Sequence, residues 1–123
     1  MSRISIIISC LNEAAVVGTL LEPLQALRGQ GHQVILVDGG SLDDTVERCR
    51  GMVDLVVTTK PGRAHQMNQG AHASNGEVLW FLHADTLANA GAGELLLKAV
   101  AKGARWGRFD VRLSGERPVF RLI

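Results

Sequence analysis

An imidazole and a carboxylate stand two positions apart directly after an apolar run. Residues 78–82 are all apolar, and His83, Ala84 and Asp85 follow them. Five consecutive apolar residues predict a strand that is covered on both faces, as in the middle of a parallel sheet. Such sheets bind ligands at the carboxyl ends of their strands, where an Asp oxygen can hold a divalent cation against a phosphate. The alternative is that Asp85 caps a following helix, since Asp is a preferred N-cap.

A second polar cluster, residues 38–45, follows another apolar run and opens a helical pattern. Its two glycines allow tight backbone geometry and the close approach of a ligand. Asp38 is placed to accept hydrogen bonds from a nucleobase or a ribose. The alternative is an ordinary strand-to-helix turn, with Ser41 or Asp43 as the helix cap. That turn would not require a carboxylate at position 38, so Asp38 favours a binding role.

Two further clusters carry charged groups beside predicted helix starts. Asn12 and Glu13 follow the first apolar run, where they would otherwise serve as a helix cap and an acidic first turn. Lys60 and Arg63 flank a Pro-Gly turn that leads into a helix, and helix N-termini favour phosphate. A cation opposes the helix dipole there, so Arg63 needs a partner.

The composition is that of one soluble globular domain. The 123 residues are 46% hydrophobic and 20% charged, with a formal net charge of +1. This charge, with three Phe, two Trp and no Tyr, argues against a nucleic-acid-binding protein. Cys10 and Cys49 form no C-x-x-C pattern and are expected to be buried and reduced. The apolar run near the N-terminus is too short for a signal peptide or an integral membrane segment, which favours a cytoplasmic location.

Strand-like and helix-like segments alternate along the chain. The expected strands are residues 4–10, 34–37, 55–58, 77–82 and 106–113, and the expected helices are residues 14–28, 42–50, 63–74 and 92–101. Pro23 is expected to kink the first helix. This order predicts an α/β fold, a mostly parallel sheet with helices on both faces. The polar clusters then share the edge where the parallel strands end.

Taken together, these segments resemble the family 2 glycosyltransferases of the GT-A fold. The matching stretches are ISIIISCLNEA, VILVDGGSLDDT, KPGRAHQMNQGA and GEVLWFLHADT. Their wording is similar to a bacterial subgroup in which the usual D-x-D motif reads H-A-D. The resemblance implies a Rossmann-like nucleotide-sugar-binding domain over residues 1–113, with residues 114–123 as the start of a truncated acceptor-side segment.

The resemblance also implies a chemistry. The donor would be a nucleotide-diphosphate sugar, with UDP favoured, and the sugar would pass to an acceptor that the sequence does not identify. Mg²⁺ or Mn²⁺ would be held by Asp85 and His83, and the ion would neutralise charge on the departing nucleoside diphosphate. His83 departs from the family, which usually has an Asp there. The implied nucleotide-binding residues are Ser9, Leu11, Asn12, Glu13, Asp38, Ser41, Asp43, Arg63 and Ala84.

The catalytic base is not predicted, because Asp110 and Glu116 are the only late carboxylates and neither lies in a matching motif. A second hypothesis is therefore a nucleotide-binding module without turnover. A nucleotidyltransferase would normally show a Gly-rich basic loop after the first strand, and residues 11–13 are not one. An unpaired sheet edge and an apolar tail invite association. We expect a homodimer, or residues 114–123 disordered or swapped onto a neighbour.

Overall fold

The chain is divided into two units by its internal contacts. The computed structural model describes residues 3–83, 92–102, 107–110 and 119–122. The first unit is Met1–Leu87 and the second is Ala88–Ile123. The predicted domain boundary after residue 113 stays a prediction.

The first unit is built on a four-stranded sheet in which every strand pair is parallel. Its strands are β1 (Ile4–Cys10), β2 (Gln33–Asp38), β3 (Leu55–Thr58) and β4 (Val78–His83), in the order β3-β2-β1-β4. In register, Ile7 of β1 lies between Ile35 of β2 and Phe81 of β4. The β-branched runs of β1 and β2 are buried, as their lack of polar alternation predicts. The predicted parallel α/β sheet is confirmed.

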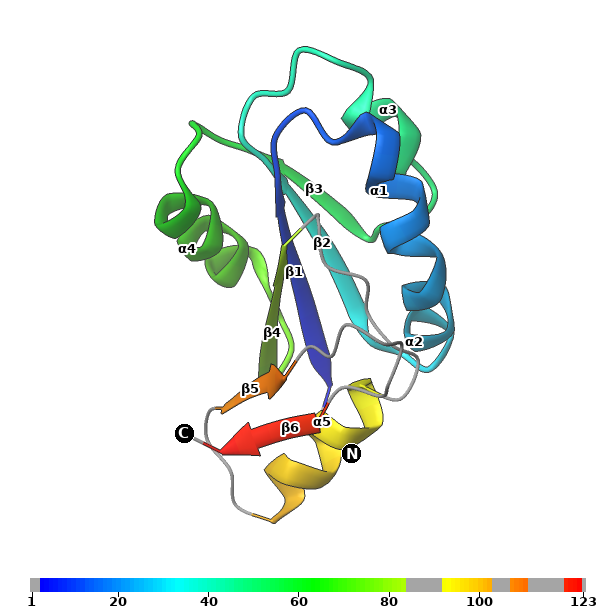
Figure 1. The fold of residues 1–123 in the computed structure, drawn as a ribbon, viewed down its shortest axis with the longest axis vertical. Coiled ribbons are helices and arrows are strands. Elements are labelled where there is room, and N and C mark those ends of the chain that lie inside the picture. Colours follow the sequence, from blue (N-terminus) through cyan, green and yellow to red (C-terminus); the bar gives the residue numbers. More distant parts are fainter. Residues whose placement is uncertain (1–2, 84–91, 103–106, 111–118, 123) are drawn as a thin grey trace. The chain divides into compact units, whose positions relative to one another are not determined.

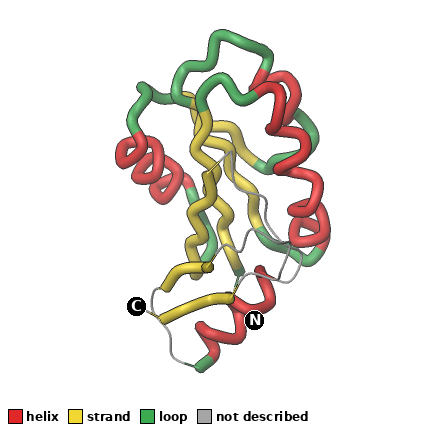
Figure 2. The backbone as a smooth tube through the Cα atoms, in the orientation of Figure 1, coloured by secondary structure: helices red, strands yellow, loops and turns green. Residues whose placement is uncertain are grey.

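Helices cover both faces of this sheet. One face carries α1 (Ala14–Leu21), a 3₁₀ turn (Glu22–Leu24), α2 (Gln25–Gly29) and α3 (Thr45–Cys49). The other face carries α4 (Arg63–Ala73), as Figure 1 shows. Within this unit, the backbone tube of Figure 2 places the strands as a middle layer between the two helical layers. The expected helices on both faces are therefore present.

Two helices differ from their predicted extents by more than one residue at an end or by an interruption, whereas α4 ends one residue early. The predicted helix over 14–28 is interrupted by the 3₁₀ turn at Pro23, which removes a backbone donor there. The prediction that the next helix begins at Leu42 is wrong, because α3 begins at Thr45. The amide of Leu42 instead donates to Asn12 Oδ1 across the neighbouring loop. That contact holds the start of the segment outside the helix.

Helix α4 approaches the sheet closely at a glycine. Gly70 is buried, and a Cβ placed there would lie 2.3 Å from Ile7 Cγ2 and 2.9 Å from Val37 Cγ2. Both neighbours are fully buried β-branched residues of the two central strands. The missing side chain is therefore what lets α4 lie against β1 and β2.

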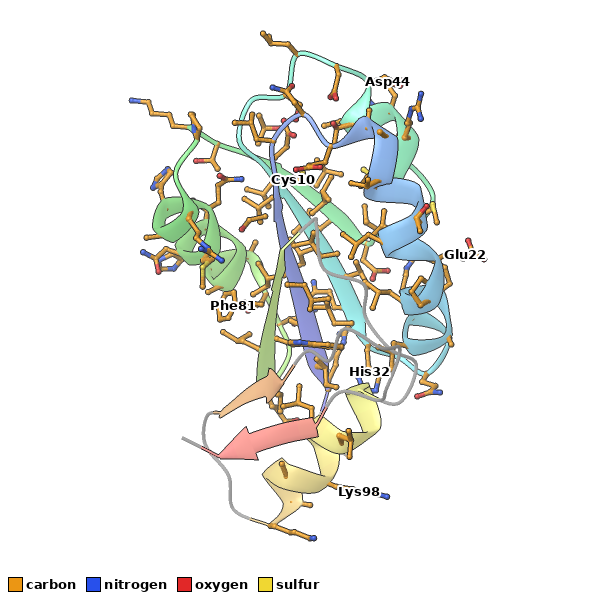
Figure 3. All side chains as sticks on the ribbon, viewed as in Figure 1. Cys10, Glu22, His32, Asp44, Phe81 and Lys98 are labelled. Atoms are coloured by element: carbon orange, nitrogen blue, oxygen red, sulfur yellow. The ribbon has the colours of Figure 1, made fainter. Side chains whose placement is uncertain are left out.

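A buried polar network closes the amino-terminal edge of the sheet. The Ser5 hydroxyl donates to Gln33 Oε1 at 2.7 Å, and the same oxygen accepts from the Asn75 amide at 3.1 Å. His32 is 6% exposed, and its Nδ1 accepts from the Ile4 amide at 3.0 Å. Burial, and then the charge of nearby Arg3, lower the pKa of His32. Figure 3 labels His32 at this edge and Cys10 toward the opposite one.

The second unit contains one helix and a two-stranded antiparallel sheet. Helix α5 (Ala92–Ala101) has its predicted bounds, and it contacts β6 (Val119–Leu122), which pairs antiparallel with β5 (Gly107–Asp110). Of the strand predicted over 106–113, only β5 lies among the described residues. Its expected place in the parallel sheet is wrong, because its partner is β6. Val119–Leu122 pair with β5 of the same chain, and the alternative of a tail swapped onto a neighbour stays a prediction.

No helix in the part of the chain that the structure describes is long and apolar enough to span a membrane.

Candidate functional site

Three loops meet at the carboxyl edge of the parallel sheet. Residues 11–13 follow β1, residues 39–44 follow β2, and residues 59–62 lead from β3 into α4. The first two loops lie side by side in Figure 1. The last residue of β4, His83, is in register with Ser9 of β1, so β4 ends at this edge as well. The topology thus brings the polar clusters of the sequence to one edge.

Asn12 joins the first two loops by reciprocal hydrogen bonds. Its backbone N–H donates to Ser41 Oγ at 2.8 Å, and its Oδ1 accepts from the Leu42 amide at 2.8 Å. Its φ of 53° lies in the left-handed region, which Asn tolerates better than most residues. Asn12 therefore fixes one loop against the other.

Asp43 and Thr45 connect the same two loops a second time, at the first residues of α1 and α3. Asp43 Oδ2 accepts from the Ala14 amide at 3.2 Å, and Oδ1 accepts from the Thr45 amide at 3.1 Å. The Thr45 hydroxyl donates to Asp43 and accepts from the Glu13 amide. These bonds, that of the Thr45 hydroxyl first, hold the pKa of Asp43 below its usual range. Asp43 thus supplies an ionised cap to α1 and α3 together.

Asp38 is buried and its carboxylate is used within the protein. It is 2% exposed, and its Oδ2 accepts from the amides of Gly40 at 3.1 Å and Ser41 at 2.9 Å. Its Oδ1 accepts from the Ser41 hydroxyl and from the Cys10 thiol, 3.7 Å away. A carboxylate has about four lone-pair positions, so these four donors match its capacity. Asp38 thereby shapes the second loop, and its contact with a nucleotide stays a prediction.

The pKa of the Cys10 thiol is shifted by its burial beside Asp38. Burial, and then the negative charge of Asp38, raise the pKa of Cys10 to about 12. Cys10 and Cys49 are both buried and free of disulfides. The predicted buried, reduced thiols are confirmed.

Of the other predicted residues at the ends of β1 and β4, the structure describes some and not others. Ser9 Oγ is buried and has no hydrogen-bond partner among the described residues, and Leu11 is 42% exposed. His83 is placed by its backbone, whereas Ala84 and Asp85 lie outside the described residues. Within those residues, no three His, Cys, Asp or Glu side chains gather as a metal site. The predicted metal ligands therefore stay predictions.

Helix α4 brings Arg63 to the same edge. Arg63 is the first residue of α4 and is exposed, and Lys60 in the preceding loop is exposed as well. Gly62 lies between them with a φ of 144°, a conformation that favours glycine. Two cations therefore stand where the helix N-terminus already favours an anion.

Gln66, like Thr45, is a residue of this edge that the sequence motifs did not single out. Its Nε2 donates to the carbonyls of Cys10 and Val37, both at 3.0 Å, and it is 5% exposed. A signal was present, because Gln66 stands four positions before Gly70 and so shares its sheet-facing side of α4. A polar residue on a buried helix face needs a partner, and the strand ends supply it.

The comparison with protein families decides where this chain belongs. The family described as "Glycosyl transferase family 2" matches residues 5–122. The chain belongs to glycosyl transferase family 2. No curated protein matches it significantly. The family assignment that the sequence motifs suggested is therefore confirmed over nearly the whole chain.

Solved structures show the fold of this family 2 chain. It is similar to glucosyl-3-phosphoglycerate synthase from Mycobacterium tuberculosis, with a TM-score of 0.73 and 22% identity over 83% of this chain. Those structures are described as complexes with Mn²⁺, UDP and glucosyl-3-phosphoglycerate, with Mg²⁺ and UDP, and with Mn²⁺, UDP-glucose and phosphoglyceric acid. The chain spans about 40% of the length of those proteins. At this identity the likeness establishes the GT-A fold.

Proposed function

We propose that the Met1–Leu87 unit is the donor site of a glycosyltransferase and binds a nucleotide-diphosphate sugar. The observation that carries the proposal is the joining of two polar loops at the carboxyl edge of a parallel sheet, the place where such sheets take ligands. Membership of family 2 supports it, and similar structures are described as complexes with UDP. A UDP-type donor is therefore the first candidate.

In this proposal, two groups of residues at this edge bind different parts of the nucleotide. The loops after β1 and β2 surround the nucleoside, and Arg63 and the start of α4 face the diphosphate, where cation and helix N-terminus act together. Some of these residues bind directly, and others, such as Asp43, hold the loops. The residues assigned to the nucleotide are Ser9, Leu11, Asn12, Glu13, Asp38, Ser41, Asp43, Arg63 and Ala84.

Mg²⁺ or Mn²⁺ is the proposed cofactor, with Asp85 and His83 as its protein ligands. A carboxylate oxygen suits either ion, and the similar structures are described with both. The bound ion would supply Lewis-acid stabilisation of the departing diphosphate. The protein's part is to supply the carboxylate of Asp85, two positions after the end of β4, and that end lies beside Ser9.

Transfer of the sugar to an acceptor is the proposed reaction. We assign neither the acceptor molecule nor a residue that acts as the general base. The rival is a module that binds the nucleotide without turnover. Release of UDP from UDP-glucose, in the presence of candidate acceptors, would favour the transferase over the binding module.

A cytoplasmic location and a homodimer complete the proposal. Two free, buried thiols suit a reducing compartment. Leu79 and Phe81 of β4 are 39% and 38% exposed, and β4 pairs only with β1 among the described strands. An apolar strand at the edge of a sheet is a place where a second copy can associate. Light scattering of the purified chain measures the oligomer directly.

Calorimetric titration with UDP and Mn²⁺ tests the donor site. We expect the wild-type chain to bind, and the Asp85→Ala variant to lose most of the metal-dependent part of the affinity. The matched control is Glu22→Ala, because Glu22 is an exposed carboxylate in the 3₁₀ turn after α1. The absence of binding to any nucleoside diphosphate by the wild-type chain would overturn the proposal.

A further inference from the structure

The buried amide of Gln66 links three segments at the carboxyl edge. Its Nε2 donates to the carbonyl oxygens of Cys10 and Val37, and its Oε1 accepts from the Gly62 amide at 3.2 Å. Both hydrogens of the amide group and one acceptor position are thus used inside the protein. With 5% of its surface exposed, the side chain lies beneath the loops.

The partners of Gln66 are the points at which the loops leave the sheet. Cys10 is the last residue of β1, and Val37 stands one residue before the end of β2. Gly62 directly precedes the first residue of α4. The Cys10 carbonyl also accepts from the Gly39 amide at 3.0 Å. One oxygen therefore accepts hydrogen bonds from both the loop after β2 and the Gln66 side chain of α4.

Gly39 leaves the space that the Gln66 amide occupies. A Cβ at position 39 would lie 3.1 Å from Cδ, Nε2 and Oε1 of Gln66. All three atoms belong to a group held by hydrogen bonds on two sides, so the shift of a few tenths of an ångström that a Cβ would require strains those bonds. Gly39 and Gln66 therefore form a matched pair, one small because the other is present.

We propose that Gln66 is a positioning residue of the donor site, which fixes the loops after β1 and β2 and the start of α4 relative to one another before a nucleotide binds. The inference rests on the proposed function, since it assigns a role in the same site. Gln66 acts through the loops and not by contact with the nucleotide, because its donors are already used by buried carbonyls. A site fixed in advance avoids the cost of ordering the loops on binding.

The test compares two buried glutamines, Gln66 of α4, which bonds the carboxyl end of β2, and Gln33, the first residue of β2. Gln66→Met keeps the length of the side chain and removes its hydrogen bonds. Gln33→Met is the control, because Gln33 is 7% exposed and accepts from Ser5 and Asn75 at the amino-terminal edge. Both variants should lower the melting temperature. Only Gln66→Met should raise the Kd for UDP with Mn²⁺, by about tenfold or more, measured by titration calorimetry. The control should change the Kd by less than about twofold, as expected for a distant site.

A second variant reaches the same amide without removing a polar group. Gly39→Ala should raise the Kd because its Cβ displaces the Gln66 amide. In a Gln66→Ala background the space is open, so the further change Gly39→Ala should add little. Equal and additive effects of Gly39→Ala in both backgrounds would contradict the pairing. An unchanged Kd in Gln66→Met would overturn the positioning role.

Hydrogen exchange separates this inference from the proposed function. Failure of the wild-type chain to bind UDP would remove the donor-site assignment and leave the loop-holding role to be measured without ligand. In that measurement, Gln66→Met should speed exchange at the amides of Asn12, Gly40 and Ser41, whereas Gln33→Met should not. Unchanged exchange at these three amides in Gln66→Met would overturn the inference.

Discussion

The contact of Gly70 with the sheet predicts a large loss of stability for Gly70→Ala. The new Cβ would lie 2.3 Å from Ile7 Cγ2, whereas carbon atoms in contact prefer about 3.5 Å or more. Helix α4 would have to move outward by about 1.2 Å, since the two side chains that it meets, on Ile7 and Val37, are fully buried. The cost of such overpacking is about 1–3 kcal/mol, and we expect the upper value here.

Helix propensity works in the other direction. Replacing Gly by Ala within a helix gains about 1 kcal/mol. The net change in the free energy of unfolding is therefore a loss of about 2 kcal/mol. At about 4 °C per kcal/mol for a chain of this size, the melting temperature should fall by about 8 °C. Thermal and urea unfolding followed by circular dichroism measure both quantities.

The control for this prediction is the same substitution in another helix. Gly18 lies inside α1, and a Cβ there would meet no atom within 4 Å. Gly18→Ala should therefore stabilise the chain by about 0.5–1 kcal/mol. The two substitutions should shift the melting temperature in opposite directions. If Gly70→Ala is as stable as the wild type, the close packing of α4 on β1 and β2 is wrong.

Three further predictions concern single groups. Thr45→Val removes the buried hydroxyl that accepts from the Glu13 amide in the loop after β1. We expect urea titrations to show a free energy of unfolding lower by about 1–3 kcal/mol. An unchanged urea midpoint would contradict the loop connection. The lowered pKa of His32 means that the unfolded chain takes up the proton first, so stability is full above pH 6.5 and declines as the pH falls through the lower folded pKa. His32→Asn, which keeps an acceptor for the Ile4 amide, should flatten that decline between pH 7 and pH 5, and an equal slope in both proteins would refute the assignment. Cys10, with its pKa raised to about 12, should resist alkylation in the folded chain at pH 8 and react after unfolding, as mass spectrometry of the labelled peptide can show.

The parallel sheet could be predicted from the sequence because each strand is a distinct apolar run. The predicted strands over residues 4–10 and 55–58 have the observed bounds, and those over 34–37 and 77–82 differ by one residue at each end. The place of β5 could not be predicted in this way. Its alternation suits any half-buried strand, and its partner β6 is a short apolar segment that carries no signal of pairing direction.

The sheet edge that carries the candidate site could be predicted from the sequence, but the hydrogen-bond partners of its side chains could not. Local rules treat Asp43 as a cap for its own helix, yet one of its oxygens accepts from Ala14 at the start of α1. The Gln66 amide bonds carbonyls that are 56 and 29 residues distant in the chain. Such contacts depend on how strands and helices pack, which periodicity and capping preferences do not describe.

The most direct measurement of the central claim is a two-dimensional amide NMR titration of the chain with UDP and Mg²⁺. We expect chemical-shift changes at the carboxyl edge, with the amides of Asn12, Ser41 and Arg63 among the largest. The amides of Ile4 and Gly76, at the amino-terminal edge, should stay unchanged. The absence of shifts, or shifts centred on the amino-terminal edge, would contradict a donor site formed by these loops.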